Sequence, residues 1–325
     1  MAIDNLMVVA FGGPTEECCG KHAECPGQAF CFVNGIFGDN PARRPRVDEV
    51  VEHYKHFGGF SKFNEITEAQ AAAVQAELKI RGHDLKVTVG YDHWLPKIAD
   101  QVVEMQRDGA DEFVTLVMAP HQSSISWDAY LRRVSEGLDK LDESSRPKWA
   151  GVVDPFWNKP GFIEALADRI KSAAASIDAD LSNSGTGLVL SAHAVPMPVV
   201  KTSKYVEQIR ETAELVATKV GATNWAVAYQ SAPSDSKIEW TTPYLEHVIE
   251  EMKDGGAQKI VAAPIGFLCD NVEVLYDLGV EGKEKADELQ LPFAAAEAVN
   301  THPAFIRQLA DNVEAKLIDL AEAHA

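Results

Sequence analysis

Three carboxylates in the stretch LCDNVEVLYDLGVE, at residues 268–281, are spaced four residues apart. They are Glu273, Asp277 and Glu281. A spacing of four returns a side chain to nearly the same face of an α-helix, so these like charges would form a row and repel one another. Such a row is either a solvated acidic face or a track for protons or hydrated cations, and local spacing does not choose between them. Gly279 interrupts the run and predicts an irregular helix there.

Three histidines follow short apolar runs that predict buried strands. His93 lies in GYDHW, His121 in APHQSSIS and His193 in SAHAVP. A neutral imidazole can accept a proton near physiological pH or bind a transition metal, and it can equally hydrogen-bond the main chain at a strand end. The pattern alone leaves both roles open.

Four of the five cysteines fall in one short segment, ECCGKHAECPGQAFC. An odd number of cysteines in a large chain does not indicate a disulfide framework. The spacing contains no C-x-x-C pair and matches no common zinc pattern. We therefore interpret Cys18, Cys19, Cys25 and Cys31 as reduced thiols in an ordered loop, with a metal site or iron–sulfur cluster as the alternative.

The elements that must position these residues are strands of parallel sheets. Short β-rich runs alternate with amphipathic helical stretches; the runs are LMVVAF, KVTVGY, EFVTLVMA, WAGVV, GLVLSA, WAVAYQ, KIVAAPI and FAAAEAV. This order predicts an α/β fold with helices on both faces of each sheet. The stretches EMQRDGADEFVTLVMAPH and EMKDGGAQKIVAAPIGF echo each other, which indicates two similar doubly wound domains. Ligands of such sheets bind outside the carboxyl ends of the strands, where the three histidines are expected.

The composition excludes several classes of function. With 325 residues, 46% of them hydrophobic, the chain is long enough for two globular domains. A formal net charge of -19 argues against nucleic acids or anionic membranes as the main partners. No run approaches the roughly 20 apolar residues of a membrane span. The opening MAIDNLMVVAFGG does not resemble a signal peptide, so a cytoplasmic location is the default expectation.

Eight motifs along the chain resemble the ferrochelatases, which insert ferrous iron into porphyrins. In order they are VVAFGGP, VVEHYKHFGGFSKFNEITEAQAAAV, GYDHWLPKI, VMAPHQSSIS, LSAHAVP, AYQS, PIGFLCDNVEVLYDLGVE and VNTHPAFI. Because the series runs from residue 8 to residue 306, it is far more specific than one short motif. The chain looks closest to the cytoplasmic forms that act on coproporphyrin III.

The resemblance implies two Rossmann-like domains, each with a parallel four-stranded sheet flanked by helices, and a porphyrin cleft between them. The expected limits are 1–158 for the N-terminal domain and 159–304 for the C-terminal domain. A terminal helix is expected at 305–325, where it can pack against the first domain. Residues from about 15 to 46 would form a lip over the porphyrin, enlarged by the cysteine-bearing insertion. Some relatives carry an iron–sulfur cluster, but mostly on cysteines elsewhere, so this loop does not inherit one.

The resemblance also implies the active-site residues. His193 matches the family's active-site histidine and Glu273 its acidic partner, and these two would accept protons from the porphyrin and bind iron. Asp277 and Glu281 match further acids on the same helix and would relay protons or metal.

Porphyrin contacts are expected mainly from the first half of the chain. Arg43, Arg44 and Arg46 in NPARRPR are candidates for propionate binding because guanidinium pairs well with carboxylate, and the alternative is a solvated loop or a helix-capping charge. The other expected contacts are Phe11, His93, His121, Ser123 and Ser124.

Two residues depart from the family pattern. Phe11 stands where many cytoplasmic relatives have tyrosine, and Asn271 stands where a histidine is common before the glutamate. Both changes put an outer metal site in doubt and leave the pair of His193 and Glu273 intact.

The expected function is that of a ferrochelatase, a lyase of haem biosynthesis that converts coproporphyrin III and Fe²⁺ to coprohaem without an organic cofactor. One alternative is protoporphyrin IX as the porphyrin. A cobalt chelatase for a sirohydrochlorin-type ring is disfavoured by the row of acids, and a non-catalytic porphyrin or haem carrier is disfavoured by the retention of His193 and Glu273. Contact with neighbouring haem-pathway enzymes is left open.

Overall fold

The chain folds into two compact units. The computed structural model describes residues 3–21, 24–233 and 236–323. The first unit comprises Met1–Ala119, Ile125–Pro155 and Ile306–Ala325. The second unit comprises Pro120–Ser124 and Phe156–Phe305. The domain limits expected at residues 158 and 304 stay a prediction.

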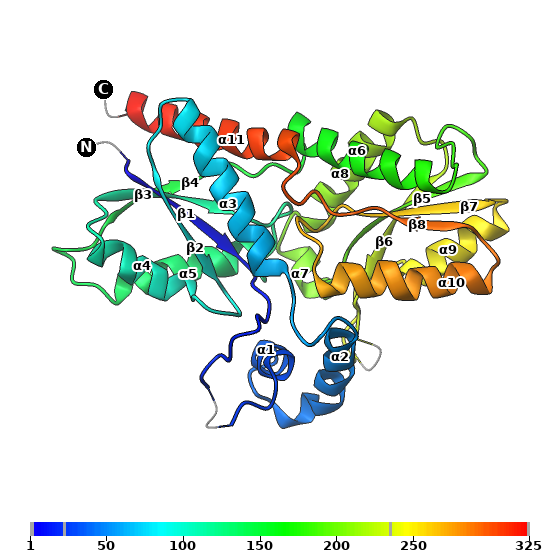
Figure 1. Cartoon of the computed structure of the whole chain (residues 1–325), viewed down its shortest axis with the longest axis horizontal. Coiled ribbons are helices and arrows are strands. Elements are labelled where there is room, and N and C mark those ends of the chain that lie inside the picture. The colour runs from blue at the N-terminus through cyan, green and yellow to red at the C-terminus, as the bar shows by residue number, and fades with distance from the viewer. Residues whose placement is uncertain (1–2, 22–23, 234–235, 324–325) are drawn as a thin grey trace. The chain divides into compact units, whose positions relative to one another are not determined.

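The first unit is built on a parallel sheet of four strands in the order β2-β1-β3-β4 (Figure 1). The strands are β1 (Asn5–Ala10), β2 (Lys86–Tyr91), β3 (Glu112–Val117) and β4 (Lys148–Val152). Every residue of β1 and β3 is buried. Their nearly continuous apolar runs therefore fit inner strands that are covered on both faces.

Helices cover both faces of the first sheet, and Figure 1 shows α3 and α11 above it and α4 and α5 below it. The apolar sides of α4 (Ile98–Arg107) and α5 (Trp127–Asp139) pack with β1 and β3 in one core cluster. The other two helices are α3 (Phe63–Ile80) and α11 (Pro303–Ala323). Two shorter helices, α1 (Gln28–Ile36) and α2 (Arg44–His56), precede α3 and are joined by the 3₁₀ turn η1 (Pro41–Arg43).

An ion-pair cluster connects α11 to the end of α3. Arg81, directly after α3, contacts Asp311 at 2.6 Å and Glu314 at 3.1 Å, both on α11. Because the Arg81 side chain is largely buried, these pairs are screened less by solvent than pairs on an open surface. The last helix of the chain therefore packs within the first unit.

The second unit repeats the arrangement with the strand order β6-β5-β7-β8. The strands are β5 (Thr186–His193), β6 (Trp225–Gln230), β7 (Lys259–Pro264) and β8 (Phe293–Ala295), and all of them are parallel. The helices are α6 (Pro160–Ser176), α7 (Met197–Lys201), α8 (Tyr205–Val220), α9 (Leu245–Asp254) and α10 (Lys283–Glu288). One core cluster joins apolar residues of β5, β7 and α9. The prediction of an α/β fold with two similar parallel four-stranded sheets is confirmed.

The helix that carries the row of acids has an unexpected geometry. Residues Val274–Gly282 form a π-helix, η2, where the spacing of four predicted an α-helix. A run of acids every fourth residue fits either helix, so the spacing could not distinguish them. The irregularity expected at Gly279 is present, and it extends over the whole segment. π-Helical turns are rare and occur frequently at functional sites.

No helix within the described residues is long and apolar enough to cross a membrane. The longest of them, α11, spans 21 residues and carries charged side chains along its length.

Candidate active site

His193 and Glu273 form a histidine–carboxylate pair in the second unit. His193 is the last residue of β5, and its Nε2 atom lies 3.7 Å from Oε2 of Glu273. The two side chains are 37% and 27% exposed, so solvent and ligands can reach both. The pair stands at the carboxyl end of a parallel strand, where ligands of such sheets bind.

The neighbouring main chain defines which nitrogen of His193 can do chemistry. Nδ1 lies 2.5 Å from the carbonyl oxygen of Ala194. A carbonyl oxygen only accepts hydrogen bonds, so in the neutral imidazole Nδ1 carries the proton and Nε2 keeps its lone pair. That lone pair is on the side of Glu273 and can accept a proton or bind a metal.

Close packing fixes the main chain at His193. The hydroxyl of Tyr205 donates to the carbonyl oxygen of His193 at 3.0 Å. Gly266, just after β7, passes so close to β5 that a Cβ atom there would lie 2.8 Å from Cβ of Ala192. The end of β5 therefore has little freedom to move, which holds the imidazole in place.

The segment before Glu273 is held by two side chains. Asp270 accepts hydrogen bonds from Nδ2 of Asn300 at 2.6 Å and from the main-chain amide of Ala298 at 2.8 Å. Asn271 accepts a hydrogen bond from the main-chain amide of Val274 at 2.8 Å. Asn271 thus satisfies an amide at the start of the helical segment.

Asp277 is the buried member of the row of acids, with 5% of its surface exposed. Its Oδ2 accepts hydrogen bonds from Nε2 of Gln230 at 3.2 Å and from the hydroxyl of Ser231. Burial raises the pKa of Asp277 to about 8, and the charges of Glu273 and Glu281 also raise it, while the bonds from Ser231 and Gln230 act in the opposite direction. Asp277 is therefore largely protonated at neutral pH.

Gln230 connects the acids to the sheet. It is the last residue of β6, and its Oε1 accepts a hydrogen bond from the hydroxyl of Ser191 at 2.5 Å. Its Nε2 donates to the carbonyl oxygen of Glu273 at 3.2 Å as well as to Asp277. Ser231 has a φ of 64°, a left-handed conformation that is uncommon for serine. The motif AYQS contains both residues, but the sequence did not predict that they form hydrogen bonds to the acids.

The three acids differ in their surroundings. Glu273 is partly buried, Asp277 is buried and Glu281 is exposed. Both flanking charges act on Asp277, so the three carboxyl groups interact with one another. A uniformly solvated acidic face is excluded by the burial of Asp277.

His121 lies inside the second unit. It is 1% exposed, and its Nε2 lies 2.9 Å from the hydroxyl oxygen of Thr212. Burial lowers the pKa of His121 to about 3, so the imidazole is neutral. Ser123 is also buried, whereas Ser124 is partly exposed. The burial of His121 favours the structural role that the sequence left open.

Phe11 and His93 lie together at the carboxyl edge of the first sheet. Phe11 follows β1 and His93 follows β2, and their ring centroids are 4.5 Å apart. Nε2 of His93 lies 3.5 Å from Oδ2 of the buried Asp92. Burial lowers the pKa of His93, although the charge of Asp92 opposes that change.

Two of the three arginines of the expected lip already have acidic partners. Arg44 pairs with Asp48 at 2.7 Å and Arg46 with Glu49 at 2.7 Å, in both cases on helix α2. The third arginine, Arg43, is exposed. The Arg44–Asp48 pair joins two exposed charges and is therefore weak, so a propionate could replace Asp48 there, whereas the side chain of Arg46 is only 12% exposed.

The structure does not support a cluster on the four neighbouring cysteines. Cys18 and Cys25 are exposed and Cys31 is buried on α1, and none of them forms a disulfide. Burial raises the pKa of Cys31 to about 12, so this thiol stays protonated. Within residues 3–21, 24–233 and 236–323 no group of three or more histidine, cysteine or acidic side chains is arranged to hold a metal.

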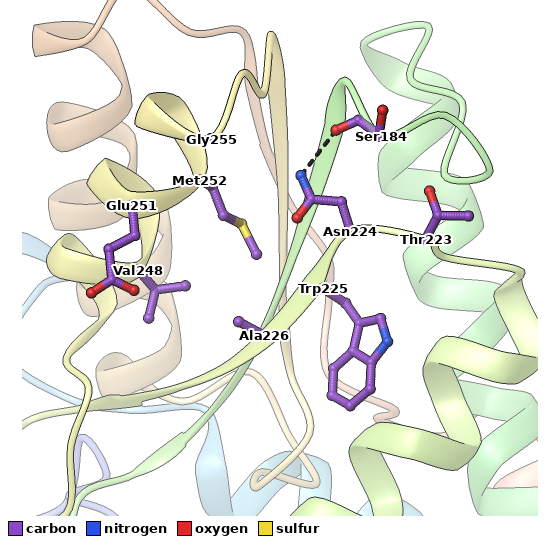
Figure 2. A pocket seen from close by; sticks show the side chains of 9 residues that line it. All are labelled: Ser184, Thr223, Asn224, Trp225, Ala226, Val248, Glu251, Met252 and Gly255. Atoms are coloured by element: carbon purple, nitrogen blue, oxygen red, sulfur yellow. Dashed lines mark hydrogen bonds between the residues drawn. The ribbon is translucent and has the colours of Figure 1, made fainter.

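Figure 2 shows a pocket in the second unit whose lining includes neither His193 nor Glu273. Its volume is about 390 Å³, and it lies at the amino ends of β5 and β6, where Asn224 donates to the carbonyl oxygen of Ser184 at 2.9 Å. Val248 and Met252 of α9 supply apolar walls. Because His193 ends β5 at the other edge of the sheet, this pocket is not the active site.

Comparison with known proteins gives one consistent result. The family model described as Ferrochelatase matches residues 40–317. A curated protein named Ferrochelatase from Deinococcus radiodurans is 33% identical over 319 residues, which cover 97% of this chain and 96% of that protein. A protein named Coproporphyrin III ferrochelatase from Nocardia farcinica is 30% identical over 333 residues, covering 99% and 90%.

The solved structure of CbiX, described as the terminal enzyme of siroheme biosynthesis in denitrifying bacteria, has a similar fold. It aligns with a TM-score of 0.53 and 15% identity over 96% of this chain and 98% of that one.

Proposed function

The chain belongs to the ferrochelatase family, and we propose that it inserts Fe²⁺ into coproporphyrin III to give coprohaem. The observation that carries the proposal is the pair of His193 and Glu273, set 3.7 Å apart at the carboxyl end of β5. Relatives that are 28% to 32% identical bear the name coproporphyrin III ferrochelatase, which supports this porphyrin over protoporphyrin IX.

Metal insertion requires the residues to accept two protons and to attract a cation. A free-base porphyrin loses two pyrrole protons for each Fe²⁺ that enters, so the charge of the macrocycle balances that of the metal. Nε2 of His193 has the free lone pair needed to accept one proton. The carboxylate of Glu273 is negatively charged and can attract the hydrated cation or accept the second proton.

Asp277 is suited to passing a proton onward. It holds a proton at neutral pH, because burial raises its pKa to about 8. It can therefore accept a proton on one oxygen only as it releases one from the other, which is the behaviour of a relay rather than of a first acceptor. Glu281, being exposed, is the member of the row that exchanges protons with solvent.

The test is metal insertion by the purified protein under anaerobic conditions. Fe²⁺ is added with either coproporphyrin III or protoporphyrin IX, and the loss of free-base absorption is followed. We expect insertion into coproporphyrin III to be the faster reaction, well above the rate without protein. No insertion into either porphyrin would refute the proposed activity, and faster insertion into protoporphyrin IX would refute the proposed substrate.

A further inference from the structure

Positive charges gather at the carboxyl edge of the first sheet in a chain that is otherwise strongly acidic. Lys97 lies just before α4, and its Nζ donates to the carbonyl oxygen of Asp92 at 2.7 Å. Arg133 of α5 contacts Oδ1 of the same aspartate at 2.8 Å. Lys21 is near enough for its charge to act on both Lys97 and His93. Lys21, Lys97 and Arg133 all act electrostatically on His93, so four basic side chains from four segments of the first unit lie near one another at this edge.

Among the described residues Lys97 forms no direct ion pair, although the charges of Asp92 and Asp100 act on it from farther away. Asp92 pairs with Arg133, and its second oxygen faces His93. Arg133 has a further partner in Glu136 at 2.9 Å. No acidic oxygen of the described residues lies within 4 Å of the Lys97 ammonium. Burial lowers the pKa of Lys97, and the charges of Lys21 and Arg133 lower it further, while those of Asp92 and Asp100 act in the opposite direction.

A half-buried ammonium without a direct ion pair gains from an anionic ligand. Removing a charge from water is unfavourable unless an opposite charge replaces the lost hydration. Lys97 is only partly buried and therefore remains open to a ligand from solvent. Arg133 is 41% exposed but already pairs with Asp92 and Glu136, so it adds positive charge beside Lys97 while Lys97 itself supplies the donor.

An aromatic surface lies beside these charges. The ring of Phe11 is half-buried and contacts the imidazole of His93, and Phe32 packs edge-on against Phe11 at 6.0 Å. A flat aromatic side chain next to an ammonium and a guanidinium fits a ligand with a flat apolar body and carboxylates at its rim. A porphyrin with propionate side chains has this chemistry.

We propose that Lys97, with Arg133 beside it, binds a propionate of the porphyrin. This inference rests on the proposed function, and it assigns propionate recognition to residues outside the arginine-rich segment. Arg44 and Arg46 already pair with acids of their own helix, whereas Lys97 forms no such ion pair with the described residues. Each additional propionate on the porphyrin can use such a site, so Lys97 contributes to the preference for a porphyrin rich in carboxylates.

The experiment compares binding of metal-free coproporphyrin III to the wild-type protein and to Lys97→Met. The readout is the change in porphyrin fluorescence at low salt. Methionine keeps the length of the side chain and removes its charge, and we expect the dissociation constant to rise about tenfold, as for the loss of one charge-assisted hydrogen bond. The matched control is Lys140→Met, because Lys140 also lies beside α5 but pairs with Asp100 at 2.8 Å. The control should bind the porphyrin like the wild type.

A second ligand distinguishes a loss of propionate recognition from a general effect on the fold. The tetramethyl ester of coproporphyrin III has no carboxylates, and both porphyrins are titrated in the same mild detergent. Lys97→Met should bind the ester like the wild type, and Lys97→Arg should restore most of the affinity for the free acid. An equal loss of affinity for ester and acid would overturn the proposal, since Lys97 would then act only on the fold.

The outcomes also distinguish this inference from the function on which it rests. If the wild-type protein binds coproporphyrin III and inserts iron while Lys97→Met binds as tightly, only the role of Lys97 is wrong. If the wild-type protein neither binds the porphyrin nor inserts iron, the proposed function fails and the role of Lys97 fails with it.

Discussion

Ser231 donates a hydrogen bond to Asp277, although the two residues are 46 positions apart in the chain. The bond joins the end of β6 to the π-helix η2 and fixes the carboxyl group behind Glu273. Because the same carboxyl group is buried, its pKa rises to about 8 and it holds a proton at neutral pH. The protein thus keeps a protonated acid next to the residues that must handle protons.

The burial of Asp277 should make the stability of the protein depend on pH. Its pKa in the folded state, about 8, exceeds the ordinary value of 3.8, so the folded state binds more protons than the unfolded state between these values. Stability from this group is therefore fully present below about pH 4 and is lost as the pH rises toward 8. Asp277→Asn removes this pH dependence. As the pH rises from 4 to 8, the free energy of unfolding of the variant should therefore increase relative to that of the wild type by a few kcal/mol, with a slope of at most about 1.4 kcal/mol per pH unit.

Urea unfolding of both proteins at a series of pH values from 4 to 8 measures this difference. Asparagine can still accept the hydrogen bonds from Ser231 and Gln230, so the comparison isolates the charge. A difference between the two proteins that stays constant with pH would show that Asp277 is ionised in the folded state.

The hydroxyl of Ser231 should hold the pKa of Asp277 below the value that burial alone would give. Its hydrogen bond favours the ionised carboxylate, so its removal should raise the pKa of Asp277. Ser231→Gly is the suitable variant, because glycine accepts the φ of 64° without strain and alanine does not. The infrared band of the protonated carboxyl group, assigned by its loss in Asp277→Asn, should persist to higher pH in the variant. An unchanged titration would mean that the bond does not influence the carboxyl group.

Loss of the imidazole at His193 should abolish metal insertion without abolishing porphyrin binding. General bases contribute about 10²- to 10⁴-fold to rates, so His193→Ala should lower kcat by at least about 10²-fold. Glu273→Gln should have an effect of similar size, because the amide neither accepts a proton readily nor attracts the cation. The matched control is His302→Gln, which breaks another histidine–carboxylate pair in the same unit, with Asp168 at 3.5 Å. Normal turnover in His193→Ala would refute the role of His193.

The sequence predicted the sheets and the strand-end positions because both depend on local patterns. Apolar runs of strand length alternate with amphipathic helices, and a run such as that of β1 is apolar because both of its faces are covered. Ligand-binding residues follow the strands, so the placement of His193 at the end of β5 could be expected from its position after GLVLSA. The resemblance to the ferrochelatases then indicated Glu273 as its partner.

Properties that depend on contacts between distant segments could not be predicted. Asp277 and Glu281 look alike in the sequence, but the end of β6 buries only Asp277. The sequence predicted the neighbouring arginines of NPARRPR as propionate ligands. The four-residue spacing of Arg44 and Asp48, however, also fits an ion pair within one helix. Nothing in the local sequence distinguishes Lys97 from other lysines. The nearby Asp92 pairs with Arg133, which lies 41 residues away from that aspartate, and local sequence does not predict this contact.

The close approach of Gly266 to Ala192 should make the end of β5 sensitive to a single added methyl group. A Cβ atom at Gly266 would lie 2.8 Å from Cβ of Ala192 and 3.0 Å from its Cα, so Gly266→Ala must shift β5 or the segment after β7. Such overpacking costs about 1–3 kcal/mol of stability. Because His193 directly follows Ala192, the shift should also lower kcat for metal insertion more than it changes porphyrin affinity. The matched control is Gly279→Ala on η2, where an added Cβ meets no atom within 4 Å. The control should be as stable as the wild type or more so, since alanine restricts the unfolded chain. Thermal unfolding and steady-state kinetics of both variants provide the measurement, and a Gly266→Ala protein with wild-type stability and kcat would show that the end of β5 is not held as tightly as this packing indicates.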